Sequence, residues 1–102
     1  MLKIINGVTM LAQQELIDAN KKFPLFRSTH EAYAIIKEEY EEALSEIERV
    51  EFELNGVWHH TKNNDKQSIL GHIEELQSSA TKLAAESVQI IAMCNKYIES
   101  KL

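Results

Sequence analysis

Residues 29–58 read THEAYAIIKEEYEEALSEIERVEFELNGVW, and their pattern is the strongest indication of the fold class. It contains no proline, and Ser28 stands directly before it with Glu31 three positions on, the pattern of a helix-starting capping box. Its apolar residues recur at the spacing of one helix face. They are Ala32, Ile36, Tyr40, Ala43, Ile47, Val50, Leu54 and Val57. The stretch therefore predicts one long helix that buries a single face.

Two further helices are predicted on either side of it. Apolar residues also show helical spacing over residues 8–22, and Pro24 disfavours helix beyond that point. Residues 1–7 are expected to be irregular, and the hydrophobic connector 23–26 is expected to pack against the core. After a polar loop, residues 66–100 contain no proline and predict one helix, or two joined near the adjacent serines at 78 and 79.

The start of the last helix has its own signal. Asn64 or Asp65 is suited to cap it, since both side chains accept hydrogen bonds from free backbone N–H groups. We expect a single all-α domain over residues 1–102, an antiparallel helical bundle of about three helices with two of them long. Oligomerisation is expected to complete the bundle, because a chain this short leaves much apolar surface uncovered.

Composition narrows the class of protein. One proline and three glycines are too few for many short strands and tight turns. Cys94 is the single cysteine, which excludes an internal disulfide and fits a reducing compartment. No apolar run approaches the ~18 residues of a membrane span, and Asn6 and Gly7 interrupt what would be a signal peptide. We expect a cytoplasmic protein without a membrane partner.

Acidic residues are concentrated in the long helix. The formal net charge is −5, and nine of the sixteen acidic residues lie between Glu31 and Glu53, against only Lys37 and Arg49. Such a segment argues against nucleic acid as a partner, because binding its backbone requires a basic patch. It indicates either a cation site or a well-solvated acidic face.

Glu39 is the first residue that favours a cation site. It falls within the apolar stripe, between Ile36 and Ala43, where an isolated charge costs several kcal/mol unless it is paired or bound to a metal. Glu38 and Glu42 add repulsion at helical spacing. One divalent cation would convert that repulsion into attraction. Carboxylates without a cysteine or histidine partner suit Mg²⁺, with Mn²⁺ as the alternative.

Glu86 is the second such residue. It is the only charge within residues 83–94, and Gln89 follows one turn later. The rest of that segment is apolar on almost every side, which predicts burial on every side, with the thiol of residue 94 in the core. If the two long helices are antiparallel, Glu86 faces Glu39 and Glu42 across the core. That arrangement would form a three-carboxylate site from two helices.

The two motifs together resemble a known family. Glu38-Glu39-x-x-Glu42 on one helix, followed by Glu86-x-x-Gln89 on a later helix, is similar to the EExxE and ExxD signature of the MazG-like all-α nucleoside triphosphate pyrophosphohydrolases. The resemblance covers roughly residues 29–100. Gln89 stands where the family has aspartate, and the separation between the motifs looks longer than usual.

The resemblance implies an activity and residue roles. Members are dimers or tetramers that hydrolyse (d)NTPs to the monophosphate and pyrophosphate, with Mg²⁺ clamping the triphosphate while water attacks the α-phosphorus. Glu38 is then the candidate catalytic residue, able to help activate water. Lys22 or Arg27 are candidates for phosphate contact. The implied metal-site residues are Glu39, Glu42, Glu86 and Gln89.

A non-catalytic interpretation stays open. The long final helix, about 50 Å at 1.5 Å per residue, and the large apolar surface also fit a helical interaction protein that forms homo-oligomers. Glu86 would then pair with Lys82, or with Lys96 of a neighbouring chain. The two interpretations differ in whether Glu39 and Glu86 converge in the fold.

Overall fold

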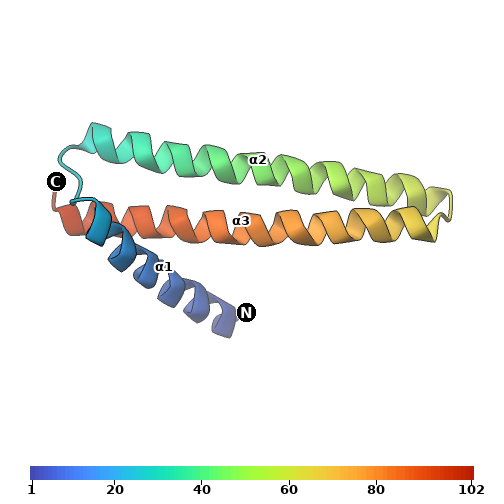
Figure 1. Cartoon of the computed structure of the whole chain (residues 1–102), viewed down its shortest axis with the longest axis horizontal. Helices are drawn as coiled ribbons and strands as arrows, with labels where there is room; N and C mark the ends of the chain where they lie inside the picture. Colours follow the sequence, from blue (N-terminus) through green and yellow to red (C-terminus); the bar gives the residue numbers. More distant parts are fainter.

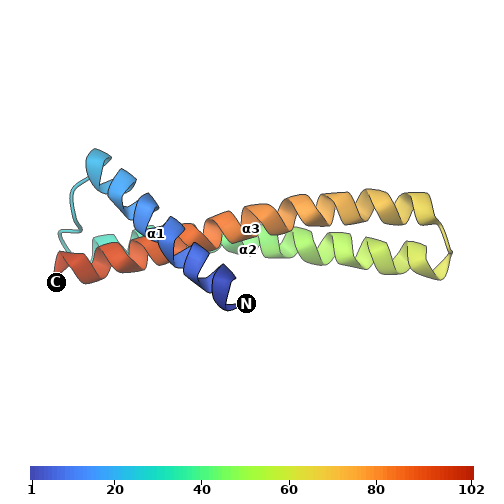
Figure 2. The same cartoon turned by 90° about the horizontal axis from the view of Figure 1, so that it is seen from below.

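In the computed structural model, which describes residues 1–102, three helices make up almost the whole chain. They are α1 (Leu2–Lys22), α2 (Thr29–Lys62) and α3 (Lys66–Ser100). α2 and α3 lie side by side and antiparallel along their whole length (Figure 1). α1 crosses α3 obliquely and packs on that helix alone (Figure 2). The predicted all-α antiparallel fold is confirmed. None of the three helices has the length and apolarity that crossing a membrane requires.

The helix boundaries differ from the expectation at two places. α1 begins at Leu2 rather than near position 8, so the prediction that residues 1–7 are irregular was wrong. A glycine costs a helix only about 1 kcal/mol, and Thr9 Oγ1 donates to the Ile5 carbonyl within this first part (2.9 Å). α2 continues beyond residue 58 to Lys62. α3 is one continuous helix, not two.

The predicted N-cap residues of both long helices are confirmed, but the second hydrogen bond of the capping box is not formed, because the Glu31 carboxylate pairs with Arg27 instead. Ser28 Oγ accepts a hydrogen bond from the Glu31 N–H (3.0 Å) at the start of α2. Asp65 accepts from the Ser68 N–H (3.1 Å) and the Ser68 hydroxyl (2.7 Å) at the start of α3, and these bonds lower the pKa of the Asp65 carboxyl. Between the helices Asn64 takes a left-handed φ of 52°, which asparagine tolerates better than most residues.

α2 and α3 pack through a seven-residue repeat, the pattern of a coiled-coil seam. On α2 the positions that α3 screens from solvent form an apolar set and a polar set, each with members seven residues apart. These sets are Ile36, Ala43, Val50 and Val57, and Glu39, Glu46, Glu53 and His60. On α3 the corresponding sets are Ile69, Leu76, Leu83 and Ile90, and His72, Ser79 and Glu86. The seam therefore carries titratable groups between the helices.

The buried face of α2 is narrower than predicted. Tyr40, Ile47 and Leu54 belong to the predicted stripe but are 53%, 47% and 56% exposed. The expectation that residues 83–94 are buried on every side was also wrong, and Cys94 is exposed. Both differences arise because each long helix is covered by one neighbour over most of its length, and α1 covers only part of α3.

The core is small and lies at one end of the hairpin. Its buried cluster consists of Phe26, Ala32, Ala92 and Met93. Here the end of α1, the connector and both long helices meet (Figure 1). The connector packs as predicted through Phe26, which is buried, whereas Phe23 is 65% exposed. This end of the hairpin is where α1 reaches the seam.

A polar layer at the other end of the seam explains the presence of a glycine near the end of α2. His72 Nδ1 lies 2.6 Å from Glu53 Oε2, and the His72 ring stacks on His60 with ring centroids 5.2 Å apart. A Cβ placed on Gly56 would lie only 2.5–2.8 Å from three atoms of the His72 ring. Gly56 therefore leaves the space that this imidazole occupies.

We expect Gly56→Ala to destabilise the protein. Alanine favours helix by about 1 kcal/mol, but its methyl group must push His72 away from Glu53, and overpacking of this kind costs about 1–3 kcal/mol. Gly71→Ala is the matched control, because a Cβ there meets nothing within 4 Å. In urea unfolding, Gly71→Ala should stabilise the protein, and Gly56→Ala should do so only when His72→Ala is also present. Equal stabilisation by both single substitutions would contradict the steric explanation.

Candidate metal centre

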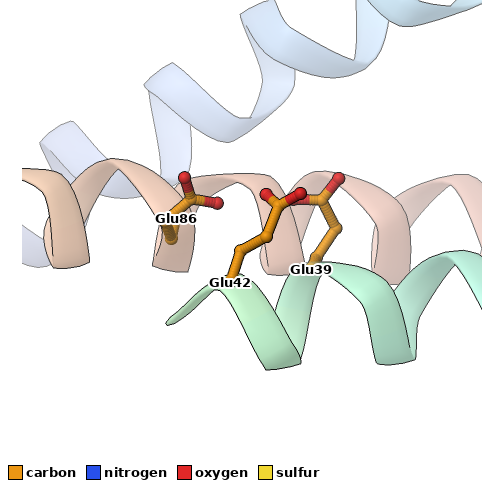
Figure 3. A group of neighbouring side chains, drawn as sticks. All are labelled: Glu39, Glu42 and Glu86. Atoms are coloured by element: carbon orange, nitrogen blue, oxygen red, sulfur yellow. The ribbon is translucent and has the colours of Figure 1, made fainter. Parts of the chain in front are cut away.

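Three carboxylates from two helices converge near the middle of the chain's long hairpin. Glu39 and Glu42 project from α2 towards Glu86 on α3 (Figure 3). Each side chain offers one oxygen such that the three oxygens lie within 4.8 Å of one another. Glu39 and Glu86 are half-buried, and Glu42 is exposed. The group is therefore open to solvent on one side and screened by the helices on the other.

The seam explains why these residues meet. Glu39 and Glu86 occupy polar positions of the seven-residue repeat on facing helices, so antiparallel packing brings them together. Glu42 lies three residues after Glu39, close to one helical turn, and projects from the same side. The geometry follows from helix periodicity and from the direction of the hairpin.

The electrostatics of the group are unfavourable in the absence of a cation. Partial burial, followed by the charges of Glu42, Glu86 and Glu38, raises the pKa of Glu39. Burial, together with the carboxyls of Glu42 and Glu46, raises the pKa of Glu86. One oxygen of Glu86, Oε2, is fully screened from solvent and has no hydrogen-bond partner. A positive ion would relieve both the repulsion and the unmet hydrogen bonding.

These raised pKa values predict a pH effect on stability. An acid whose pKa is higher in the folded state binds more protons when folded, so stability falls as pH rises from the ordinary carboxyl pKa through the raised value. We expect the metal-free protein to melt at a higher temperature at about pH 5 than at pH 7. Thermal denaturation of the wild type and of Glu86→Gln at both pH values measures this. The pH dependence should be smaller in the variant, and an equal dependence in both would contradict the prediction.

The remaining predicted site residues are not part of this group of three carboxylates. Glu38 is exposed beside Glu39, near enough to raise its pKa. Gln89 is half-buried, and its Nε2 donates to Glu15 Oε2 on α1 (2.8 Å). Lys22 is exposed at the end of α1. The structure thus brings together three of the four predicted metal-site side chains and links the fourth to α1.

The alternative pairings of Glu86 are not formed within the chain. No ion pair joins Glu86 to Lys82 or to Lys96. The charged groups that act on Glu86 are instead the carboxyls of Glu42 and Glu46. Within one chain the charge of Glu86 is therefore not matched by lysine.

A cavity of about 430 Å³ adjoins the carboxylates. Glu39, Gln89 and Arg27 form part of its wall. Arg27 Nε also lies 3.4 Å from Glu31 Oε2. The apolar part of the wall comes from the end of α1, the connector and the two long helices: Ala19, Phe23, Phe26, Ile35 and Met93. The cavity thus lies beside the carboxylate group and has a volume suited to a small ligand.

Two further polar residues of this region were not identified from the sequence. Glu15 lies on the side of α1 that also buries Ala12 and Leu16, and an acid at such a position was the available signal. Lys96 lines the cavity and is only 4% exposed. Its position in the last turns of α3 gave no signal, because lysines are common on exposed helix surfaces.

Comparisons with known proteins give no match for this chain. No protein family, no curated protein and no solved structure is significantly similar to it. Its function has therefore to be argued from the geometry of the carboxylates and the adjoining cavity.

Proposed function

We propose that the chain is a Mg²⁺-dependent pyrophosphohydrolase, similar to the MazG-like enzymes, that cleaves (d)NTPs to the monophosphate and pyrophosphate. The observation that carries the proposal is the convergence of Glu39, Glu42 and Glu86 from two helices. Three carboxylate oxygens without sulfur or imidazole form the donor set that Mg²⁺ and Mn²⁺ prefer. The unpartnered Oε2 of Glu86 adds support, because a buried carboxylate oxygen without a hydrogen-bond donor or a cation destabilises the fold.

In this proposal each residue of the site has its own role. Glu39, Glu42 and Glu86 hold the ion, which supplies charge stabilisation for a triphosphate in the adjoining cavity. Gln89 is held by Glu15 and presents its amide at the cavity wall. Glu38, which is exposed beside Glu39, would accept a proton from the attacking water. The cytoplasm, which holds both nucleotides and Mg²⁺, is the proposed setting.

The direct test is pyrophosphate release from a panel of dNTPs and NTPs with Mg²⁺, with Mn²⁺, and with a chelator. The proposal requires metal-dependent release from at least one nucleotide. It fails if no nucleotide is cleaved and neither ion changes the melting temperature.

A second candidate function is supported by the uncovered surface. The accessible area is 7595 Å², whereas a compact chain of this mass exposes about 5,900 Å². The radius of gyration is 17.5 Å, against about 13 Å for a compact chain of this length. The excess area is of the order of what one partner buries in a stable dimer, about 800 Å² or more.

A regular apolar stripe shows where a second copy would pack. Tyr33, Tyr40, Ile47 and Leu54 follow one another every seven residues along α2 and are all exposed. A repeat of this kind on an exposed face is typical of helices that pack against another helix. We therefore propose a homodimer of hairpins. In the enzyme this dimer would be the structural scaffold. If the protein is instead a non-catalytic homo-oligomeric interaction protein, self-association is its function.

A further inference from the structure

Lys96 is the only lysine that the fold buries. Its residue is 4% exposed, and its Nζ lies 5.0 Å from the centroid of the Phe26 ring. No carboxylate lies within ion-pair distance of this ammonium group. Contact with an aromatic face offsets only part of the cost of removing an ammonium from water. The ammonium group of this largely covered side chain thus lacks an anion within the chain.

The charges around the cavity leave a place for that anion. Four charged residues line the cavity: Arg27, Glu31, Glu39 and Lys96. Arg27 and Glu31 form an ion pair with each other. Lys96 and Glu39 line the same space but form no ion pair, and Glu39 belongs to the carboxylate group. A ligand that fits both would present an anion to Lys96 and a cation to Glu39.

We propose that Lys96 binds a phosphoryl group of a nucleoside triphosphate whose bound Mg²⁺ lies at Glu39. The nucleoside part would contact the apolar wall that includes Phe23 and Met93, which is large enough for such a group. The identity of the ligand rests on the proposed function, whereas the phosphate contact of Lys96 rests on its burial without a partner. Arg27 is a weaker candidate, because it is already paired and its side chain is 82% exposed.

The physical consequence is a coupling between metal and phosphate. Without a cation the carboxylates repel a phosphate in the cavity, so Mg²⁺ should tighten phosphate binding, and phosphate should tighten Mg²⁺ binding by the same factor. Lys96→Met keeps an unbranched side chain that is only one heavy atom shorter, but removes the charge. Loss of one charge-assisted contact should weaken binding roughly tenfold or more.

The test measures calorimetric binding of inorganic pyrophosphate and of a non-hydrolysable dNTP analogue, each with and without Mg²⁺. Lys96→Met should weaken binding of both probes at least tenfold, whereas Lys96→Arg should bind within a few-fold of the wild type. Lys82→Met, at an exposed position of the same helix, is the matched control and should bind as the wild type does. Without ligand, Lys96→Met should melt at the same temperature as the wild type or higher, because it removes a charge that has no anionic partner in a largely covered side chain.

The outcomes separate this inference from the proposed function. Equal binding by the wild type and Lys96→Met overturns the inference, and a lower melting temperature with unchanged binding shows that Lys96 only packs on Phe26. Lys96-dependent binding without any nucleotide cleavage supports the inference and rejects the enzyme. Cleavage that Lys96→Met leaves unchanged supports the enzyme and rejects the inference.

Discussion

Replacing Glu86 by glutamine is expected to lower Mg²⁺-dependent pyrophosphate release at least ~100-fold. Substitutions that only orient metal ligands already cost about 10–100-fold, and Glu86 is one of three carboxylates within 4.8 Å of one another. The same substitution should raise the melting temperature of the metal-free protein. A neutral amide removes the repulsion with Glu42 and Glu46 and the desolvated charge that raise the pKa of Glu86.

Because Glu86→Gln should lower pyrophosphate release but raise the melting temperature, the experiment distinguishes loss of a metal ligand from misfolding. Loss of activity through misfolding would lower both, whereas loss of a metal ligand lowers activity alone. Glu74→Gln is the control, since Glu74 is an exposed glutamate on the same helix. It should leave release and melting temperature unchanged. Full activity of Glu86→Gln would remove Glu86 from the site.

The second large effect is expected at the dimer surface. Ile47→Glu should convert a homodimer into monomers, weakening association roughly 1,000-fold. A charge in the centre of an apolar interface costs about 2 kcal/mol or more, and the symmetry of a homodimer introduces it twice. Sedimentation velocity or light scattering over a dilution series measures the change.

Asn55→Glu is the matched control for this surface. Position 55 directly follows Leu54, the last residue of the exposed apolar stripe on α2. It is exposed and continues the polar face that also carries Glu41 and Glu48. The added charge there should leave association unchanged. A wild-type protein that stays monomeric at micromolar concentration, or equal effects of both substitutions, would contradict the proposed dimer.

The position of Glu39 is an example of what periodicity alone predicts. Its place within an apolar stripe follows from the order of residues along one helix, and the structure screens it from solvent as expected. The approach of Glu86 needed one more assumption, that the long helices are antiparallel. The short loop between them makes that direction the ordinary outcome.

How wide a face of each long helix is buried could not be predicted in the same way. Tyr40 and Cys94 lie on apolar helix faces, yet both are exposed in the single chain. A pattern of apolar residues shows which face avoids water but not whether the covering surface belongs to the same chain. The polar seam positions at Glu53 and His72 were also missed, because the contact between them depends on the exact register of the two helices.

Three helices, the N-cap residues of the two long ones and the acidic face of α2 all follow from local sequence, because each depends on residues within a few turns of one another. Tertiary structure alone decided where α1 crosses α3, and with it the link between Glu15 and Gln89 and the burial of Lys96 beside Phe26. These contacts join residues seventy or more positions apart, so they depend on how whole helices pack and not on local pattern.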